Sequence, residues 1–191
     1  MNQLFPIFIK MHQIQILLVG AGPVGLEKLQ AILRSSTSDN ITIVAEKYIP
    51  QVLEYIKGKN NIQYEQRRLQ EVDLNDKELV IVASNNSQLN QQIREWCIQK
   101  SILVNIADKP ELCDFYLGSI VQKGNLKIGI STNGKSPTIA KRLKEFFNDL
   151  LPEEIDETLE LMHSYRNQLK GNFTQKIKTL NAHTQEIISK G

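Results

Sequence analysis

An apolar segment that leads into closely spaced glycines constrains this chain more than any other feature. Ile16–Val19 has the composition of a buried β-strand, and it is followed by Gly-x-Gly-x-x-Gly and then by helical spacing over Leu26–Leu33. The order strand, glycine loop, helix is typical of dinucleotide binding. There, Gly20 permits the tight turn, Gly22 lets a pyrophosphate approach the backbone, and Gly25 lets helix and strand pack closely. The alternative is a glycine-rich turn that binds nothing.

An acidic residue in the right place supports the first interpretation. Ile41–Ala45 is a β-branched run that predicts the next strand, and Glu46 follows it. A carboxylate at this point, about twenty residues beyond the glycines, accepts hydrogen bonds from a ribose hydroxyl. Glu46 therefore favours NAD, because it would repel the 2′-phosphate of NADP, although the adjacent Lys47 weakens that preference. The alternative is a solvated charge at a strand end.

Composition excludes several classes of protein. A chain of 191 residues with 41% hydrophobic content can bury a core, and a net charge of +2 gives no reason to expect a nucleic-acid partner. Cys97 and Cys113 lack metal-ligand spacing, which predicts reduced thiols, a cytoplasmic location and no metal site. No apolar run approaches the roughly eighteen residues of a membrane span. The apolar Leu4–Ile9 lacks the flanks of an export signal, so we expect an edge segment there.

Strands alternate with helices through the first part of the chain. Leu79–Ala83 and Ile102–Ala107 are further predicted strands, with a helix over Gln88–Lys100 between them. This alternation predicts an α/β fold with a Rossmann-type, doubly wound parallel sheet. Ser84 and Asn85 follow one strand and Asp108 follows the next, at the rim where such sheets bind ligands.

The pattern changes after about residue 113. Ser119–Gln122 and Leu126–Ile130 flank Lys123-Gly124-Asn125, which predicts an antiparallel hairpin. Helices are predicted over residues 137–150, 152–170 and 173–189. We therefore expect an NAD-binding Rossmann domain at 1–113, a small α+β dimerisation and substrate segment at 114–150, and a C-terminal helical domain at 151–191. Apolar faces with little core of their own favour a homodimer.

One match argues for a different chemistry. Gly129–Ser136 fits Gly-x-x-x-x-Gly-Lys-Ser, the pattern of a phosphate-binding loop. Against an NTPase, Pro137 follows at once, the preceding strand belongs to a hairpin, and no later strand ends in an aspartate that would hold Mg²⁺. The loop can still present amides, hydroxyls and Lys135 to an anion such as a carboxylate.

Five blocks, taken in order, resemble the precorrin-2 dehydrogenase family of siroheme synthesis. The resemblance extends from about Leu4 to Pro152. The blocks are Leu4–Phe8, Val19–Val24, Ala83–Asn86 with Asn90, Asn105–Phe115 and Ile130–Pro137. The resemblance implies oxidation of precorrin-2 to sirohydrochlorin with NAD, and in some members insertion of Fe²⁺ as a second activity.

The resemblance also implies roles for individual residues. The family's important aspartate falls on Asp108, and its serine loop falls on the substrate-binding candidates Ser131, Thr132, Asn133, Gly134 and Lys135. Cofactor contacts fall on Gly20, Gly22, Pro23, Val24, Gly25, Glu46, Lys47, Ser84 and Asn85. Ser84-Asn85-Asn86 replaces a more usual Thr-Asp-Asp, which removes two acids near the cofactor.

The chemistry of Asp108 can be argued without the family. Dehydrogenation removes a hydride and a proton, so a site needs a nicotinamide acceptor and a nearby base, and Asp108 has the type and place of that base. If iron is inserted, the same carboxylate would accept the pyrrole protons. The alternative is a turn cap before Lys109-Pro110. A nucleotide sensor without catalysis would need neither Asp108 nor the serine loop.

Overall fold

The chain divides into two compact units, Met1–Leu117 and Gly118–Gly191. The computed structural model describes residues 2–35, 40–169 and 175. The division falls after Leu117 rather than after residue 113, because the intervening segment is hydrogen-bonded to the first unit. Asp114 N donates to Val104 O (2.8 Å), and Asn105 Nδ2 donates to Phe115 O (2.8 Å).

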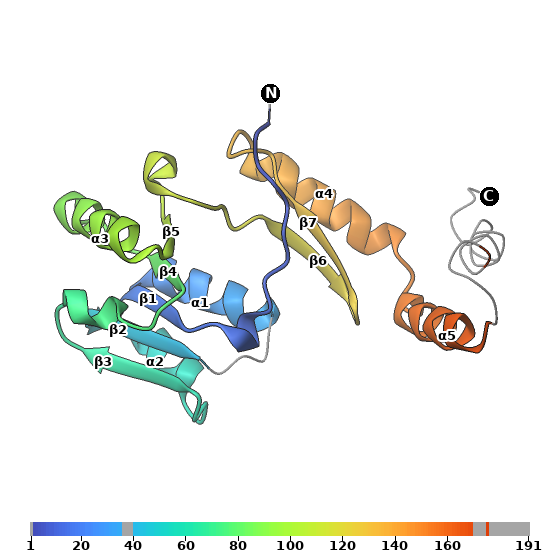
Figure 1. Cartoon of the computed structure of the whole chain (residues 1–191), viewed down its shortest axis with the longest axis horizontal. Helices are drawn as coiled ribbons and strands as arrows, with labels where there is room; N and C mark the ends of the chain where they lie inside the picture. The colour runs from blue at the N-terminus through green and yellow to red at the C-terminus, as the bar shows by residue number, and fades with distance from the viewer. Residues whose placement is uncertain (1, 36–39, 170–174, 176–191) are drawn as a thin grey trace. The chain divides into compact units, whose positions relative to one another are not determined.

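A five-stranded parallel sheet with the order β3-β2-β1-β4-β5 organises the first unit (Figure 1). Its strands are β1 (Ile16–Ala21), β2 (Ile41–Tyr48), β3 (Ile62–Gln66), β4 (Leu79–Val82) and β5 (Leu103–Ile106). Its helices are α1 (Pro23–Ser35), α2 (Pro50–Ile56) and α3 (Ser87–Lys100), with the short helices η1 (Met11–Gln13), η2 (Glu71–Leu74) and η3 (Pro110–Leu112). This order is the Rossmann topology, and its switch point lies between β1 and β4. The predicted fold class is confirmed.

Alternating strand residues build two cores, one on each face of the sheet. Leu18 and Ile43 pack on one face with Leu29 of α1 and Val52 of α2. On the other face, residues such as Val80 pack with Ile93 and Cys97 of α3, Leu74 of η2 and the half-buried Trp96. Because both faces are covered, the central strands are apolar at nearly every position. Burial on both faces therefore explains the near-continuous apolar runs in the sequence.

Strand β2 is longer than its apolar run. Glu46 and Lys47 were predicted to follow the strand, but β2 continues to Tyr48, so both residues lie inside it. The reason is a register shift after Val19, beyond which Tyr48 pairs with Ala21. The Tyr48 hydroxyl also lies 2.9 Å from Ile43 O and 3.0 Å from Glu65 O, either of which can accept its proton, and this helps to fix the strand end.

The N-terminal segment also differs from expectation. Residues 4–9 form no strand, so the predicted edge segment pairs with no strand in the described part of the chain. Its apolar side chains are exposed, with Phe5 and Phe8 at 84% and 72%.

In the second unit, the described residues form the predicted hairpin and the helices α4 and α5. Strands β6 (Ser119–Lys123) and β7 (Leu126–Ile130) are antiparallel, α4 (Pro137–Leu150) packs against β6, and α5 (Ile155–Gln168) follows. Helix α5 begins at Ile155, three residues later than predicted. The predicted helix at 173–189 lies outside the described residues apart from Gln175, which is helical. No helix of the described chain is long and apolar enough to cross a bilayer.

Candidate functional site

Two glycines of the first loop are required by the backbone around them. Gly20 has φ +100°, and a Cβ there would collide with the carbonyl oxygen of Ala83. A Cβ on Gly25 would collide with the carbonyl oxygen of Gly20. Gly20 therefore allows the turn beneath the end of β4, and Gly25 allows α1 to approach β1, which are the roles expected of them.

Gly22 differs: apart from its two chain neighbours, no atom of the described residues lies within 4 Å of the place where its Cβ would be. Helix α1 begins at Pro23, so the amides of Val24 and Gly25 belong to its first turn, where no intrahelical acceptor is available. Open space beside free amides at a helix N-terminus is a suitable place for phosphate. The loop therefore fits the pyrophosphate of a dinucleotide.

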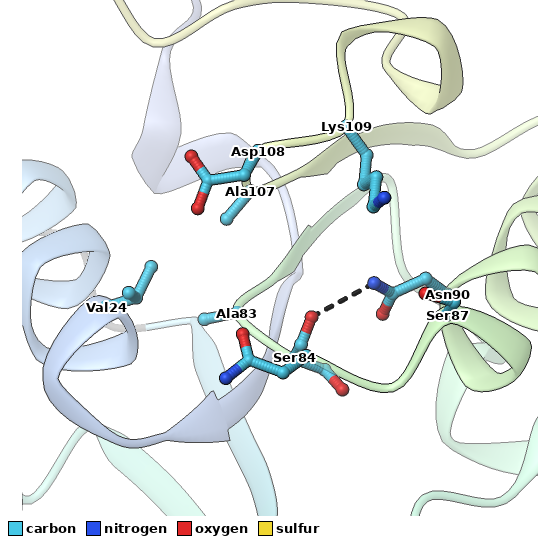
Figure 2. Close-up of a pocket in the computed structure, with 9 residues that line it drawn as sticks. Val24, Ala83, Ser84, Ser87, Asn90, Ala107, Asp108 and Lys109 are labelled. Carbon is cyan, nitrogen blue, oxygen red and sulfur yellow. Dashed lines mark hydrogen bonds between the residues drawn. The ribbon is translucent and has the colours of Figure 1, made fainter.

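A hollow of about 150 Å³ adjoins this loop at the ends of β4 and β5 (Figure 2). It brings together four of the predicted site residues, Val24, Ser84, Asn85 and Asp108, from three segments of the chain. The remaining lining residues are Ala83, Ser87, Asn90, Ala107 and Lys109. The hollow lies at the switch point of the sheet, where Rossmann folds bind their ligands.

Polar residues after β4 hold the loop on one side of the hollow. Asn86 caps α3, since its side chain accepts hydrogen bonds from Gln88 N and Leu89 N (3.1 Å each). Asn90 is only 1% exposed, and its Nδ2 donates to Ser84 O (3.0 Å, the dashed line in Figure 2). Its Oδ1 has no partner among the described residues. Asn86 caps a helix as well as an aspartate would, so this departure from the family pattern leaves the fold intact.

Asp108 stands in a tight turn that follows β5. Lys109 N donates to Ile106 O (3.2 Å), and Asp108 has φ +59°. In the described chain no group hydrogen-bonds or ion-pairs with its carboxylate, which in Figure 2 extends toward the side where Val24 lies. The carboxylate thus caps nothing, which weighs against the turn-cap alternative.

The ribose-binding candidates lie apart from the hollow. Glu46 and Lys47 do not line it. The Glu46 carboxylate lies 3.5 Å from Arg68 Nε, and both side chains are mostly exposed, so the pair adds little stability. Arg68 was not predicted, because it lies beyond β3 and nothing in the sequence relates it to Glu46.

The loop Ser131–Lys135 belongs to the second unit and is closed by its own hydroxyl groups. Thr132 Oγ1 accepts from Ser136 N (3.2 Å) and donates to Ser136 O (3.1 Å), and Ser131 Oγ accepts from Asn133 N (3.2 Å). Ser131, Gly134 and Lys135 are exposed. Antiparallel pairing of β7 with β6 also removes the parallel strand that a phosphate-binding loop follows. The described residues contain no group of three side chains suited to a metal ion.

A Rossmann sheet with an open glycine loop at its switch point defines a dinucleotide-binding protein. Residues 7–119 match the model of an NAD(P)-binding family, and residues 123–149 match that of the central region of sirohaem biosynthesis proteins. The chain belongs to this NAD(P)-binding family.

Curated relatives agree with the family. Siroheme synthases of Vesicomyosocius okutanii and Thioalkalivibrio sulfidiphilus are 33% and 31% identical, over 99% and 87% of this chain. The chain covers 40% and 33% of their respective lengths. A solved structure, SirC, precorrin-2 dehydrogenase, shares the fold with a TM-score of 0.75 and 21% identity, over 97% of this chain and 90% of that one. The resemblance drawn from the motifs is confirmed.

Proposed function

We propose that the chain oxidises precorrin-2 to sirohydrochlorin with NAD. The observation that carries this proposal is the Asp108 carboxylate, which has no partner in the described chain and lines the hollow beside an open glycine loop. The names of the relatives, siroheme synthase and precorrin-2 dehydrogenase, supply the substrate class.

Each residue has a defined task in this reaction. When bound, the oxidised nicotinamide would accept the hydride that leaves a substrate carbon. The first-turn amides of α1 and the space above Gly22 would hold the pyrophosphate. Asp108 would take up the proton that leaves with the hydride, so that oxidation yields reduced cofactor and a protonated carboxyl group. Ser84 and Asn85, which line the hollow beside the end of β4, would form one wall of the site.

The Asp108→Asn variant tests the assignment. Asparagine tolerates positive φ, so stability and dinucleotide affinity should be unchanged, whereas loss of a general base lowers the rate about 10²–10⁴-fold. NADH absorbance with precorrin-2 measures the rate. Asp76→Asn is the matched control, because Asp76 has φ +58° and is exposed at a turn away from the hollow. A near-normal rate in Asp108→Asn, together with reduced thermal stability, would assign this residue a structural role.

We propose NAD rather than NADP as the natural cofactor, because a carboxylate at Glu46, if it faces the ribose, would repel a 2′-phosphate. Arg68 and Lys47 partly offset that charge. We expect NAD to bind about tenfold more tightly, a difference of roughly 1.4 kcal/mol. Glu46→Gln should reduce the difference in calorimetric titrations. Equal affinities in the unmodified chain would remove this role from Glu46.

The substrate-binding role of the second unit also remains a proposal. Its exposed Ser131 and Lys135 suit a substrate carboxylate, so Ser131→Ala should raise KM more than it lowers kcat.

Fe²⁺ is proposed as a substrate of a second activity, with Asp108 receiving the pyrrole protons. Absorbance of the product with and without Fe²⁺ separates dehydrogenation from iron insertion.

A homodimer is proposed from the outer face of α4. Four apolar residues about one turn apart, Ile139, Leu143, Phe146 and Leu150, are 54%, 39%, 57% and 61% exposed. An apolar stripe of this kind is commonly buried in a symmetric contact. Phe146→Glu should convert a dimer to a monomer in sedimentation, whereas Lys141→Glu, on the same helix, should not. A monomeric unmodified chain with full activity would contradict the proposal.

A further inference from the structure

The thiol of Cys113 holds both sides of the turn that carries Asp108. Its Sγ accepts a hydrogen bond from Ile106 N (3.1 Å). It also lies 3.2 Å from Ile106 O and 3.2 Å from Lys109 O, either of which can receive the thiol proton. Ile106 and Lys109, which flank Ala107 and Asp108 in the turn, are thus both bonded to the Cys113 thiol.

The turn needs such support. Asp108 has φ +59°, a left-handed backbone conformation that is uncommon for a residue with a side chain. Within the described chain the Asp108 carboxylate forms no hydrogen bond that would stabilise this conformation. Across the turn, the backbone is joined by one hydrogen bond, from Lys109 N to Ile106 O.

Cys113 itself belongs to a fixed segment. Its neighbour Asp114 accepts hydrogen bonds from Val104 N (3.0 Å) and from Arg94 Nη1 (2.6 Å). Asn105 Nδ2 reaches Phe115 O on the other side (2.8 Å). The segment after η3 is therefore anchored along β5 and to α3, and the thiol transmits that rigidity to the turn.

The state of the thiol agrees with hydrogen bonding rather than with nucleophilic attack. Burial raises the pKa of Cys113 above its ordinary value, so the group keeps its proton at neutral pH. A protonated thiol can donate one hydrogen bond and accept others.

We propose that Cys113 is a positioning residue for the dehydrogenase reaction, which keeps the Ile106–Lys109 turn in the conformation that presents the Asp108 carboxylate to the substrate. The inference rests on the proposed role of Asp108. Cys113 does not line the hollow, so it acts on the reaction through the turn alone.

Replacements of Cys113 in the full chain test the proposal. Cys113→Ala removes every bond from the thiol to the turn, and we expect kcat to fall about tenfold while the Kd for NAD and the KM for precorrin-2 stay unchanged. Cys113→Ser keeps a donor and an acceptor at nearly the same place and should recover most of the rate. Cys97→Ala is the matched control, because Cys97 is buried in the same core but has no bond to the turn. It should lower thermal stability without lowering kcat.

A double variant separates positioning from other roles. If Cys113 acts only through Asp108, then Asp108→Asn with Cys113→Ala should be no slower than Asp108→Asn alone. An additive loss, or a Cys113→Ser variant as slow as Cys113→Ala, would overturn the inference. Suppose that Asp108→Asn is slow but Cys113→Ala has the kcat of the unmodified chain. The positioning role of Cys113 would then be overturned, while Asp108 would remain the proposed base. An active Asp108→Asn would instead remove the proposed base.

Discussion

The loop at Gly20–Gly25 leaves a parallel strand in the middle of a sheet, whereas the loop at Gly129–Ser136 leaves an antiparallel hairpin. Both lead into a helix that begins with proline, at Pro23 and Pro137. The first loop leaves its helix amides beside an open hollow. In the second, the Ser136 side chain accepts from Ile139 N and so occupies a first-turn amide of α4.

This difference shows that a phosphate-binding sequence pattern predicts a nucleotide site only when the strand before it belongs to a parallel sheet. In the first loop, neighbouring parallel strands end at the same edge and place Ser84 and Asp108 around the glycines. In the second, hydroxyl groups of the loop bond its own backbone, which favours a rigid surface loop over a nucleotide cradle.

Dinucleotide binding gives the largest contrast between the loops. Gly22→Val fills the open space with a side chain without touching the protein, so the fold should survive while NAD binding weakens more than about 100-fold. Lys135→Ala, the matched change in the second loop, should leave NAD binding unchanged. Calorimetric titration with NAD, beside thermal melts, measures both effects. A Gly22→Val variant that binds NAD normally would show that the pyrophosphate lies elsewhere.

Stability gives a smaller contrast. Gly20→Ala adds a Cβ against Ala83 O at φ +100°, and backbone strain alone should cost about 1–3 kcal/mol before the collision is counted. Gly134 has φ +73° and open space around it, so Gly134→Ala should cost only the backbone strain of about 1–2 kcal/mol. Urea unfolding of both variants compares the costs. Equal losses would mean that the two loops are packed alike.

Acid pH gives the smallest contrast and concerns only the unit that holds the glycine loop. Burial would raise the pKa of Asp114, but the hydrogen bonds from Arg94 and Val104 outweigh it and hold the pKa below its ordinary value. This stabilisation is complete above the unfolded-state pKa of about 3.9 and is lost as pH falls through the folded-state pKa. Asp114→Asn should therefore be less stable than the unmodified chain at pH 7, and the difference should shrink as pH falls below about 3.9.

Fluorescence of Trp96, the only tryptophan of the chain, follows unfolding of this unit. Asp76→Asn, at an exposed turn, is the control for removing one carboxylate from this unit. A stability difference between Asp114→Asn and the unmodified chain that stays constant as pH falls would show that the carboxylate acts through shape rather than charge.

Residues with a repeating local pattern could be placed from the sequence. The apolar runs, the glycine spacing and the hairpin signal gave the sheet, the first loop and β6–β7, and helix α4 has the predicted bounds. Polar residues after strands identified Ser84, Asn85 and Asp108 as neighbours, because parallel strands end at one edge of a sheet.

Features that depend on long-range contacts could not be placed in this way. The extension of β2 past Glu46 rests on pairing of Tyr48 with Ala21 after a register shift, which no local pattern encodes. Asn90 looks like an ordinary polar helix residue until the fold buries it beside Ser84. The bonds from the Cys113 thiol to the Asp108 turn likewise appear only when the segment after η3 lies along β5.

The seating of Gly20 beneath the carbonyl of Ala83 has a consequence for the order of folding. Strand β1 pairs with β2, its neighbour in the sequence, and with β4, which is synthesised much later. The glycine loop has its complete surroundings only after the end of β4 packs against it, and that non-local pairing is expected to be slow. A folding intermediate that holds only β1, α1 and β2 would have the complete glycine motif and no competent cofactor site, so gain of NAD affinity should lag behind gain of helix in refolding.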